Sequence, residues 1–219
     1  METILFLHGW GGNGDSFAAV KKYFERDYCA LSPAMPCSPD AVWTMEDYAL
    51  YIEEVLRDSA VTRCHIVCHS FGARVAAMLI ARNPQLVDKL VVCGGAGLRS
   101  KFRLSVWMKI RLYKFKRRIF GHARGGSSDY RALSENGKKT FNNIIRRDLS
   151  AEVAAITAPT LLIYGTRDRA TPVYMGRRWK KLCPHAELKI YRGAGHFAYL
   201  DKGAEFIKDV IKFIQNNNA

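Results

Sequence analysis

Three side chains that together could carry out acyl transfer are spread along the sequence: Ser70, Asp168 and His196. A serine hydroxyl becomes a good nucleophile when an imidazole removes its proton, and a carboxylate must orient that imidazole. The sequence supplies each group in a short glycine-containing segment: CHSFG at residues 68–72, YGTRD at 164–168 and GAGHF at 193–197. We therefore take Ser70, His196 and Asp168 as candidate catalytic residues.

The candidate nucleophile Ser70 follows a predicted strand, His65–Cys68, and precedes a predicted helix, Ala73–Arg82. A tight strand-to-helix turn exposes a serine hydroxyl at the carboxyl end of the strand, which is the geometry of a nucleophile elbow. Strand and helix crowd such a turn, so small residues are needed two positions before and after the serine. Gly72 satisfies this requirement, whereas Cys68 replaces the usual glycine. The alternative interpretation of Ser70 is an ordinary helix N-cap.

The candidate acid and base follow two later predicted strands, Thr160–Tyr164 and Glu187–Tyr191. Taken singly, Asp168 is typical of a turn and His196 of an exposed loop. The carboxyl ends of neighbouring parallel strands gather at one edge of a sheet, which is where ligands bind. The joint placement of both residues with Ser70 therefore favours a catalytic site at that edge.

A glycine-rich segment, HGWGG at residues 8–12, follows the first predicted strand. Glycines allow the backbone to turn sharply, so that the N–H of Trp10 and the N–H of Phe71 can both face a substrate oxygen. We expect these two amides to form an oxyanion hole. His8 is a rival base, but no acid follows it at short range, and we expect it to support the loop by hydrogen bonding.

With these four motifs the sequence resembles, over nearly its full length, a small esterase-like serine hydrolase of the α/β-hydrolase fold. The resemblance implies that Ser70 attacks an acyl carbonyl, that His196 shuttles the proton and that Asp168 holds the imidazole. It implies that water releases the acyl-enzyme and that no metal or organic cofactor takes part. Dehalogenases and epoxide hydrolases of this fold carry an aspartate at the position of Ser70, so the serine argues against both activities.

The residue patterns themselves indicate an α/β protein, because short β-rich runs alternate with longer helical patterns. The predicted strands are Thr3–Leu7, Cys29–Ser32, His65–Cys68, Leu90–Cys93, Thr160–Tyr164 and Glu187–Tyr191. The predicted helices are Ser16–Glu25, Thr44–Asp58, Ala73–Arg82, Val173–Leu182 and Ala204–Asn216. We expect a mostly parallel sheet of about six strands flanked by helices. Two strands usually precede the HGxxG strand in the family, so the resemblance implies a shortened, all-parallel core.

The residues between about 98 and 150 lack a strand pattern and are strongly basic. From Arg99 to Asp148 there are fifteen Lys and Arg against three acids, so this segment holds most of the net charge of +14. An apolar stripe at helical spacing is formed there by Leu104, Met108, Leu112, Phe115 and Ile119. We predict a basic helical cap at residues 98–150, inserted between two parts of one hydrolase core at residues 1–97 and 151–219.

The basic cap leaves its partner open. The plain interpretation is a lid helix with a solvated basic face over the site of a small-molecule acyl substrate. The alternatives are an anionic substrate, an acidic acyl carrier protein or an anionic membrane surface. Nucleic acid is disfavoured because the sequence has no recognisable binding motif, although the charge could neutralise many phosphates.

The composition agrees with one globular domain, because 48% of the 219 residues are hydrophobic and 25% are charged, which excludes a disordered polymer. No apolar run reaches the ~20 residues that a transmembrane helix needs. The amino terminus lacks the basic start and apolar segment of a signal peptide, so we expect a cytoplasmic protein. The six cysteines show no metal-binding spacing, and we expect them to be free thiols.

Three functions fit these observations. The first is hydrolysis of an acyl ester by Ser70, His196 and Asp168. The second is carbon–carbon bond hydrolysis, a lyase reaction or acyl transfer to an acceptor other than water, with the same residues on the same fold. The third is a ligand-binding protein that keeps the pocket without turnover. We adopt the first as the working hypothesis.

Overall fold

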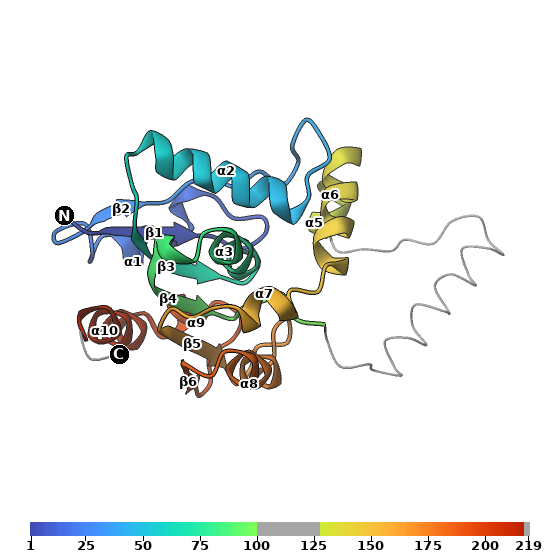
Figure 1. The fold of residues 1–219 in the computed structure, drawn as a ribbon. Coiled ribbons are helices and arrows are strands. Elements are labelled where there is room, and N and C mark those ends of the chain that lie inside the picture. Colours follow the sequence, from blue (N-terminus) through green and yellow to red (C-terminus); the bar gives the residue numbers. More distant parts are fainter. Residues whose placement is uncertain (100–127, 217–219) are drawn as a thin grey trace.

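A six-stranded parallel sheet forms the centre of the computed structural model, which describes residues 1–99 and 128–216 (Figure 1). Its strands are β1 (Thr3–Leu7), β2 (Cys29–Leu31), β3 (Cys64–His69), β4 (Val87–Cys93), β5 (Thr160–Gly165) and β6 (Ala186–Tyr191). Their order across the sheet is β2-β1-β3-β4-β5-β6, and every neighbouring pair is parallel. The predicted α/β fold with about six strands is confirmed.

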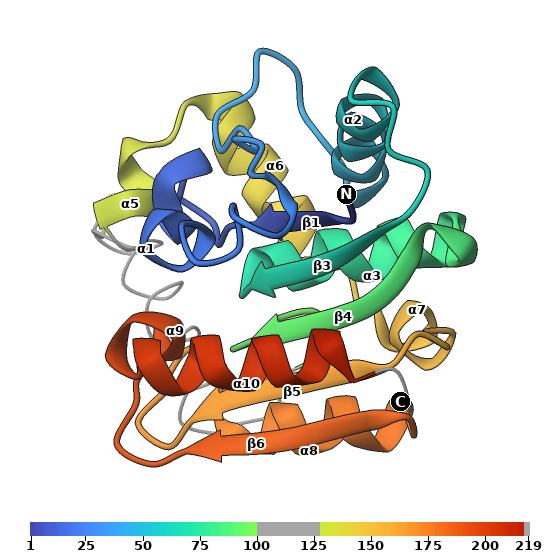
Figure 2. The ribbon, with the colours of Figure 1, turned by 90° about the vertical axis from the view of Figure 1, so that its left-hand side faces the viewer.

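Helices cover both faces of this sheet, and two others lie beyond the carboxyl ends of its strands (Figures 1 and 2). The helices are α1 (Ala18–Lys21), α2 (Met45–Asp58), α3 (Phe71–Arg82), α5 (Ser128–Ala132), α6 (Glu135–Arg146), α7 (Ser150–Ala154), α8 (Val173–Leu182), α9 (Ala198–Asp201) and α10 (Gly203–Gln215), with 3-10 turns at Gly14–Phe17 and Pro84–Leu86. Helices α2, α3, α7 and α8 lie on one face, while α1 and α10 lie on the other (Figures 1 and 2). The sheet is therefore the middle layer of three.

Alternating residues of a strand pack into the two hydrophobic cores, one on each face of the sheet. On β1, Leu5 and Leu7 pack toward α2 and α3, whereas Ile4 and Phe6 pack toward α1 and α10. Successive strand side chains point to opposite faces, so a strand covered on both sides must be apolar at every position. All five residues of β1 are buried, which explains why its sequence has no polar alternation.

A capping box fixes the amino-terminal boundary of α2. The Thr44 side chain accepts the Asp47 N–H while the Asp47 carboxylate accepts the Thr44 N–H, so α2 begins where the sequence predicts. The predicted helix Ser16–Glu25 is too long, because α1 ends at Lys21 and i→i+3 turns follow. These turns bring Phe24 into the core, with its ring 6.1 Å from that of Phe6.

Helices α5 and α6 lie beyond the carboxyl ends of the strands (Figures 1 and 2). Both belong to the segment predicted as a cap, whereas its apolar stripe from Leu104 to Ile119 lies outside the described residues. The described ends of the segment meet, because the Leu149 N–H donates to the Gly97 carbonyl at 3.0 Å. This backbone contact is the neck through which the chain leaves the sheet and returns to it.

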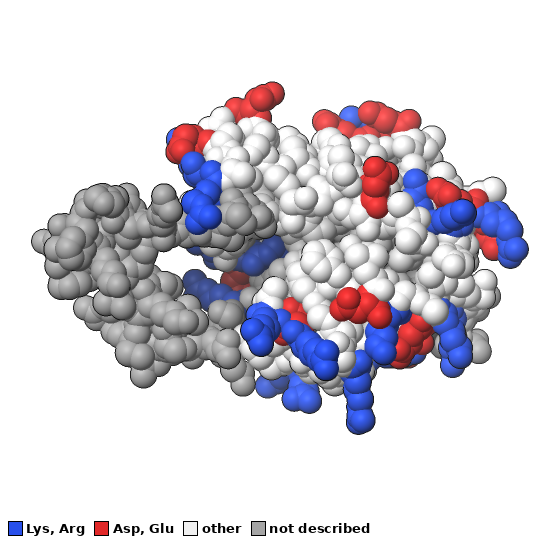
Figure 3. Space-filling view, turned by 180° about the vertical axis from the view of Figure 1, so that it is seen from behind, with Lys and Arg blue, Asp and Glu red and all other residues white. Residues whose placement is uncertain are grey.

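Charged side chains of both signs lie on the face seen in Figure 3, and basic ones predominate along its lower edge. Helix α8 carries Arg177, Arg178, Lys180 and Lys181. Among the described residues, none of the helices combines the length and the apolarity required to cross a bilayer.

Candidate active site

Ser70 occupies the turn between β3 and α3, as the sequence predicts. Its φ of 49° and ψ of −104° place it in the left-handed half of conformational space, which a non-glycine residue adopts only under constraint from its surroundings. The turn is fixed by its own backbone: the Ser70 N–H donates to the Cys93 carbonyl, and the Ser70 carbonyl accepts from Ala73 and Ala96. This is the strained geometry of a nucleophile elbow.

The residues that flank the elbow are packed against neighbouring strands. A Cβ on Gly72 would lie 2.1 Å from the Leu7 carbonyl oxygen, so this position accepts only glycine without movement of β1. Cys68 is fully buried, and its thiol donates to the Val91 carbonyl at 3.3 Å. The departure from glycine at position 68 is thus accommodated within the core beside β4.

The structure brings the three predicted site residues together. The His196 Nε2 atom lies 3.0 Å from Ser70 Oγ, and the His196 Nδ1 atom lies 2.8 Å from Asp168 Oδ2. The residues come from the turns that follow β3, β5 and β6, and 126 positions separate the serine from the histidine. A carboxylate oxygen can only accept, so Nδ1 carries a proton and Nε2 is free to accept the serine proton.

Asp168 is buried, and donors surround both of its carboxylate oxygens. Oδ1 accepts the backbone N–H groups of Ala170 and Thr171, each at 2.8 Å, while Oδ2 accepts from the Thr171 hydroxyl at 2.7 Å and from His196. Burial alone would raise the pKa of the Asp168 carboxyl, but the hydrogen bonds from His196 and Thr171 outweigh it and lower the pKa. The carboxylate therefore stays ionised beside the imidazole.

Thr171 is a site residue to which the sequence analysis assigns no role. Its Oγ1 atom lies 2.8 Å from the Gly94 carbonyl, 2.7 Å from Asp168 Oδ2 and 3.2 Å from His196 Nδ1. Its role could have been predicted from its position, because it lies three residues after Asp168 and just before Pro172 and α8. At that spacing a threonine both closes the turn and reaches the carboxylate.

His8 supports the glycine-rich loop, as expected from the sequence. Its Nδ1–H donates to the Gly9 carbonyl at 2.7 Å, and its Nε2 accepts the Met35 N–H at 2.8 Å. Because a backbone N–H can only donate, Nε2 carries no proton and the ring is neutral. Burial lowers the pKa of His8, which keeps this state at neutral pH. Both ring nitrogens are therefore occupied by the backbone.

The two residues expected to form an oxyanion hole lie side by side. The rings of Trp10 and Phe71 meet edge to face, with centroids 5.3 Å apart. Phe71 is the first residue of α3, so no intrahelical bond uses its N–H. The loop that carries Trp10 follows β1 and turns at Gly11, whose φ is 79° and whose N–H donates to Cys37 Sγ.

Helix α6 is attached to the core beside this loop. Arg74 on α3 is buried, and its guanidinium donates to the carbonyl oxygens of Ile144 and Arg147 at the end of α6. On the same helix, the Phe141 ring lies 5.2 Å from the Trp10 ring. One aromatic contact thus joins the predicted cap to the predicted oxyanion loop.

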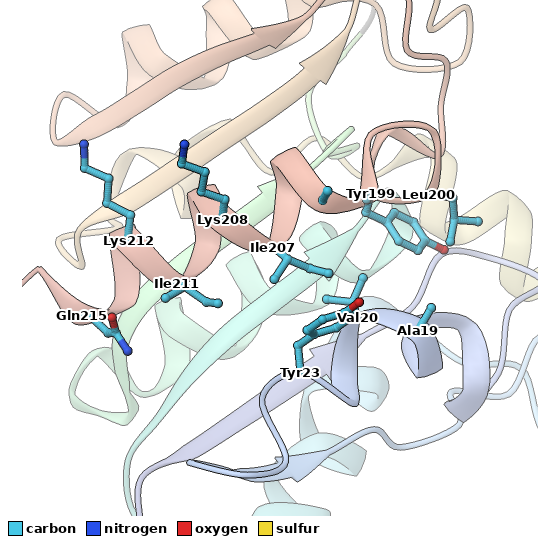
Figure 4. Close-up of a pocket in the computed structure, with 12 residues that line it drawn as sticks. Ala19, Val20, Tyr23, Tyr199, Leu200, Ile207, Lys208, Ile211, Lys212 and Gln215 are labelled. Carbon is cyan, nitrogen blue, oxygen red and sulfur yellow. The ribbon is translucent and has the colours of Figure 1, made fainter.

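A broad apolar groove of about 780 Å³ lies away from Ser70, between α1 and α10 (Figure 4). Tyr23, Ile207 and Ile211 line it, and Tyr199 lies at its end near α9. No cluster of three His, Cys, Asp or Glu side chains that could hold a metal ion occurs in residues 1–99 and 128–216. All six cysteines are free thiols, as expected.

Relatives with assigned names agree with this architecture. The 2-hydroxy-6-oxononadienedioate/2-hydroxy-6-oxononatrienedioate hydrolase of Cupriavidus pinatubonensis is 26% identical over 252 aligned positions, which cover 98% of this chain and 87% of that protein. Among solved structures, a bacterial membrane phospholipase A superposes with a TM-score of 0.81 at 20% identity, over 100% of this chain and 80% of the other. An esterase from Exiguobacterium antarcticum superposes with a TM-score of 0.79 at 18% identity, over 99% and 92%.

The two superpositions show a shared fold at low sequence identity. A sequence model of the alpha/beta hydrolase family matches residues 4–209, a range that contains every site residue named above. The chain therefore belongs to the alpha/beta hydrolase family.

Proposed function

We propose that this chain is a serine hydrolase that cleaves a carboxylic (acyl) ester through an acyl-enzyme. The observation that carries the proposal is the hydrogen-bonded series from Ser70 Oγ through the His196 imidazole to Asp168, with separations of 3.0 and 2.8 Å. A nucleophile, a base in contact with it and an acid that orients the base are the groups that acyl transfer requires. Ser70 is half-buried, whereas its neighbours His69 and Phe71 are buried.

In the first step the Ser70 oxygen attacks the ester carbonyl carbon while its proton moves to His196 Nε2. The carbonyl π electrons pass to the oxygen, and the N–H groups of Trp10 and Phe71 stabilise the resulting oxyanion. The intermediate then breaks its bond to the leaving oxygen. His196 returns the proton to that oxygen, so an alcohol departs and the acyl group stays on Ser70.

In the second step water takes the place of the alcohol. His196 Nε2 removes a proton from water as the water oxygen attacks the acyl carbon, and the same two amides stabilise the second oxyanion. The bond to Ser70 breaks, and His196 returns the proton to the serine oxygen. Asp168 remains ionised throughout and stabilises the imidazolium that forms in each step, in agreement with its lowered pKa.

The charge of the chain supports an anionic or carrier-bound acyl group as the substrate. Fifteen basic residues and three acids lie between Arg99 and Asp148, the segment that runs from the neck through the predicted cap. Such an excess raises the local concentration of anions and accelerates their association at low ionic strength. An acidic carrier protein or an anionic membrane surface would present the acyl group to the same segment.

Hydrolysis of a carbon–carbon bond is the second candidate, and one observation favours it. The relative from Cupriavidus pinatubonensis is named as a hydrolase of 2-hydroxy-6-oxononadienedioate and covers 98% of this chain. A carbon leaving group departs as an enolate and must take up a proton, so the substrate has to carry a carbonyl group conjugated to the bond that breaks. An ester needs only the groups described above, and for this reason we place it first.

Labelling and turnover with Ser70→Ala test the proposal. We expect a fluorophosphonate probe to modify Ser70 in the wild type, and we expect turnover of p-nitrophenyl butyrate to fall by at least about 10³-fold in the variant. Ser59→Ala is the matched control, because Ser59 is an exposed serine at the end of α2. Labelled peptides identified by mass spectrometry give the modified residue.

A panel of substrates then separates the candidates. It contains acyl esters of different length and charge, an acyl carrier protein ester, anionic vesicles and a vinylogous 1,5-diketone. Ester turnover that rises with negative charge and falls with salt supports the ester proposal. Turnover of the diketone alone assigns the second candidate, whereas stoichiometric binding without turnover of any compound contradicts both. If a high concentration of the fluorophosphonate leaves Ser70 unmodified in the wild type, the serine mechanism is contradicted.

A further inference from the structure

His69 is the last residue of β3 and lies between three segments of the site. Its ring is 2% exposed, and its Nε2 atom lies 2.9 Å from the backbone carbonyl oxygen of His196. A carbonyl can only accept a hydrogen bond, so His69 Nε2 carries the proton and donates it. The side chain adjacent to the predicted nucleophile is thus bonded to the backbone of the predicted base.

The faces of the His69 ring are also in contact. The His196 ring lies 4.6 Å from it between centroids, and the Tyr199 ring lies 5.2 Å away. On another side, a Cβ added to Gly9 would lie only 2.7 Å from His69 Nδ1, so the HGWGG loop passes directly against the imidazole. His69 therefore joins the oxyanion loop, the elbow and the histidine loop by direct contact.

Tyr199 fixes His69 from the side opposite the elbow. It is 3% exposed, and its ring packs on Phe17 at 4.6 Å and on Phe206 at 6.1 Å. Figure 4 shows Tyr199 at the end of the groove between α1 and α10. These contacts belong to the core between the sheet and helices α1 and α10. The His69 ring therefore packs against a Tyr199 ring that is itself held by the core.

The neutral protonation state of His69 is compatible with its position next to the base His196. Burial, and then the neighbouring His196, lower the pKa of His69 to about 4. His69 is therefore neutral around pH 7 and adds no positive charge beside His196 when that imidazole takes up the serine proton. A permanently charged side chain at this distance would oppose that proton transfer.

We propose that His69 is a positioning residue, whose Nε2–H bond to the His196 carbonyl and ring contact with the His196 imidazole hold the base against Ser70. The inference rests on the proposed function for its kinetic test. The competing interpretation is that His69 only fills space under the elbow. A filler can be replaced by any side chain of similar volume, whereas a positioning donor can be replaced only by another N–H donor with the same reach.

Two substitutions separate these interpretations. His69→Gln keeps an amide N–H donor at nearly the distance of Nε2, while His69→Leu keeps volume without a donor. We expect kcat for p-nitrophenyl butyrate to fall about 10- to 100-fold in His69→Leu, because small displacements of a catalytic group cost that much. KM should stay within about two-fold, because His69 is buried and presents almost no surface to a substrate. His69→Gln should recover most of kcat.

A spectroscopic measurement tests the position of His196 without reference to turnover. The proton between His196 Nδ1 and Asp168 gives a low-field proton NMR signal, which we expect to be retained in His69→Gln and lost or shifted in His69→Leu. His185→Gln is the control, because His185 is an exposed histidine in the turn before β6. This signal remains informative even if the wild type turns over no ester.

Two results would overturn the inference. One is a kcat in His69→Leu within two-fold of the wild type. The other is an equal loss of activity in both variants with the low-field signal retained in each, which would assign His69 to packing alone. Thermal unfolding of each variant shows whether a loss of kcat reflects a loss of folded protein. The fluorophosphonate experiment on the wild type reports failure of the proposed function separately.

Discussion

At the scale of single residues, Asp168 shows how a buried carboxylate remains charged. Each of its oxygens accepts two hydrogen bonds, and the donors come from a turn of four residues and from His196. Charge-assisted hydrogen bonds of this kind are stronger than neutral ones, so together they offset the cost of burial. The direction in which the imidazole faces follows from the same bonds.

We predict that Thr171→Val lowers kcat and that Thr171→Ser retains it. Valine keeps the branched shape but removes the hydroxyl, whose single proton bonds Asp168 Oδ2, so Oδ2 is left with one donor fewer. Loss of a hydrogen bond to a charged group costs about 1.5–3 kcal/mol, which corresponds to a fall in kcat of roughly 10- to 100-fold if the bond acts on the oriented state. Steady-state kinetics measure it.

The outcome for the two variants must differ for this role to stand. Equal kcat in Thr171→Val and the wild type would show that the backbone N–H groups orient Asp168 without the hydroxyl. A fall in Thr171→Ser as large as that in Thr171→Val would show that the γ-methyl group, rather than the hydroxyl, supports the turn.

The sequence predicts some of these residues and not others, for a physical reason. Ser70, Asp168 and His196 can be found because each follows a strand, and strand ends converge by topology alone. Thr171 could have been found from its spacing of three residues after Asp168, whereas the role of His69 rests on a hydrogen bond to a distant part of the chain, which spacing does not encode. The motif containing His69 is evident in the sequence, but its bond to a carbonyl 127 positions later is not.

At the scale of elements, unbroken apolar runs locate strands better than they locate short helices. The six predicted strands match the observed ones to within a few residues. The four inner strands are almost entirely buried, whereas the edge strands β2 and β6 are partly exposed. Helix α1 is shorter than predicted, since the burial of Phe24 beside Phe6 favours turns over continued helix. The amphipathic stripe from Leu104 to Ile119 lies outside the described residues, and the basic cap stays a prediction.

We predict that Arg74→Met loosens α6. The guanidinium is the buried donor to two carbonyl oxygens at the end of this helix, and burial lowers the pKa of Arg74 only to about 10, so it is charged at neutral pH. A carbonyl left buried without a donor costs about 1–3 kcal/mol. We expect faster amide hydrogen exchange in α6 in this variant, measured by mass spectrometry.

Arg82→Met is the matched control, because Arg82 lies on the same helix α3 but forms an ion pair with Glu53 at the surface. Its substitution should leave exchange in α6 unchanged, since exposed ion pairs contribute little. If Arg74→Met exchanges like the control, the attachment of α6 depends on other contacts, such as that between Phe141 and Trp10.

At the scale of the whole molecule, folding buries three neutral histidines. His8, His65 and His69 are each at most 5% exposed, and burial is the largest cause that lowers the pKa of each. Their folded-state pKa values thus lie below the 6.5 of an unfolded chain. Between the two values the unfolded state binds more protons, so the free energy of unfolding decreases as pH falls.

We predict full stability from these groups above about pH 6.5 and a progressive loss toward pH 4. For His69 alone, a pKa of about 4 in the folded state corresponds to roughly 3 kcal/mol lost across that range. Urea unfolding at pH 7.5 and pH 4.5 measures the difference. His69→Gln should reduce the difference, whereas the exposed control His185→Gln should leave it unchanged. A protein more stable at pH 4.5 than at pH 7.5 contradicts this account.

Because Gly97 and Leu149 are in contact, the length of the segment between them does not affect the arrangement of the sheet. The two ends of the segment are adjacent, so a segment of any length can connect them without moving the strands. The intervening segment can therefore change by insertion, deletion or grafting at this junction while Ser70, His196 and Asp168 keep their positions. Chimaeras joined at these two residues are the natural units for exchanging this segment within the family.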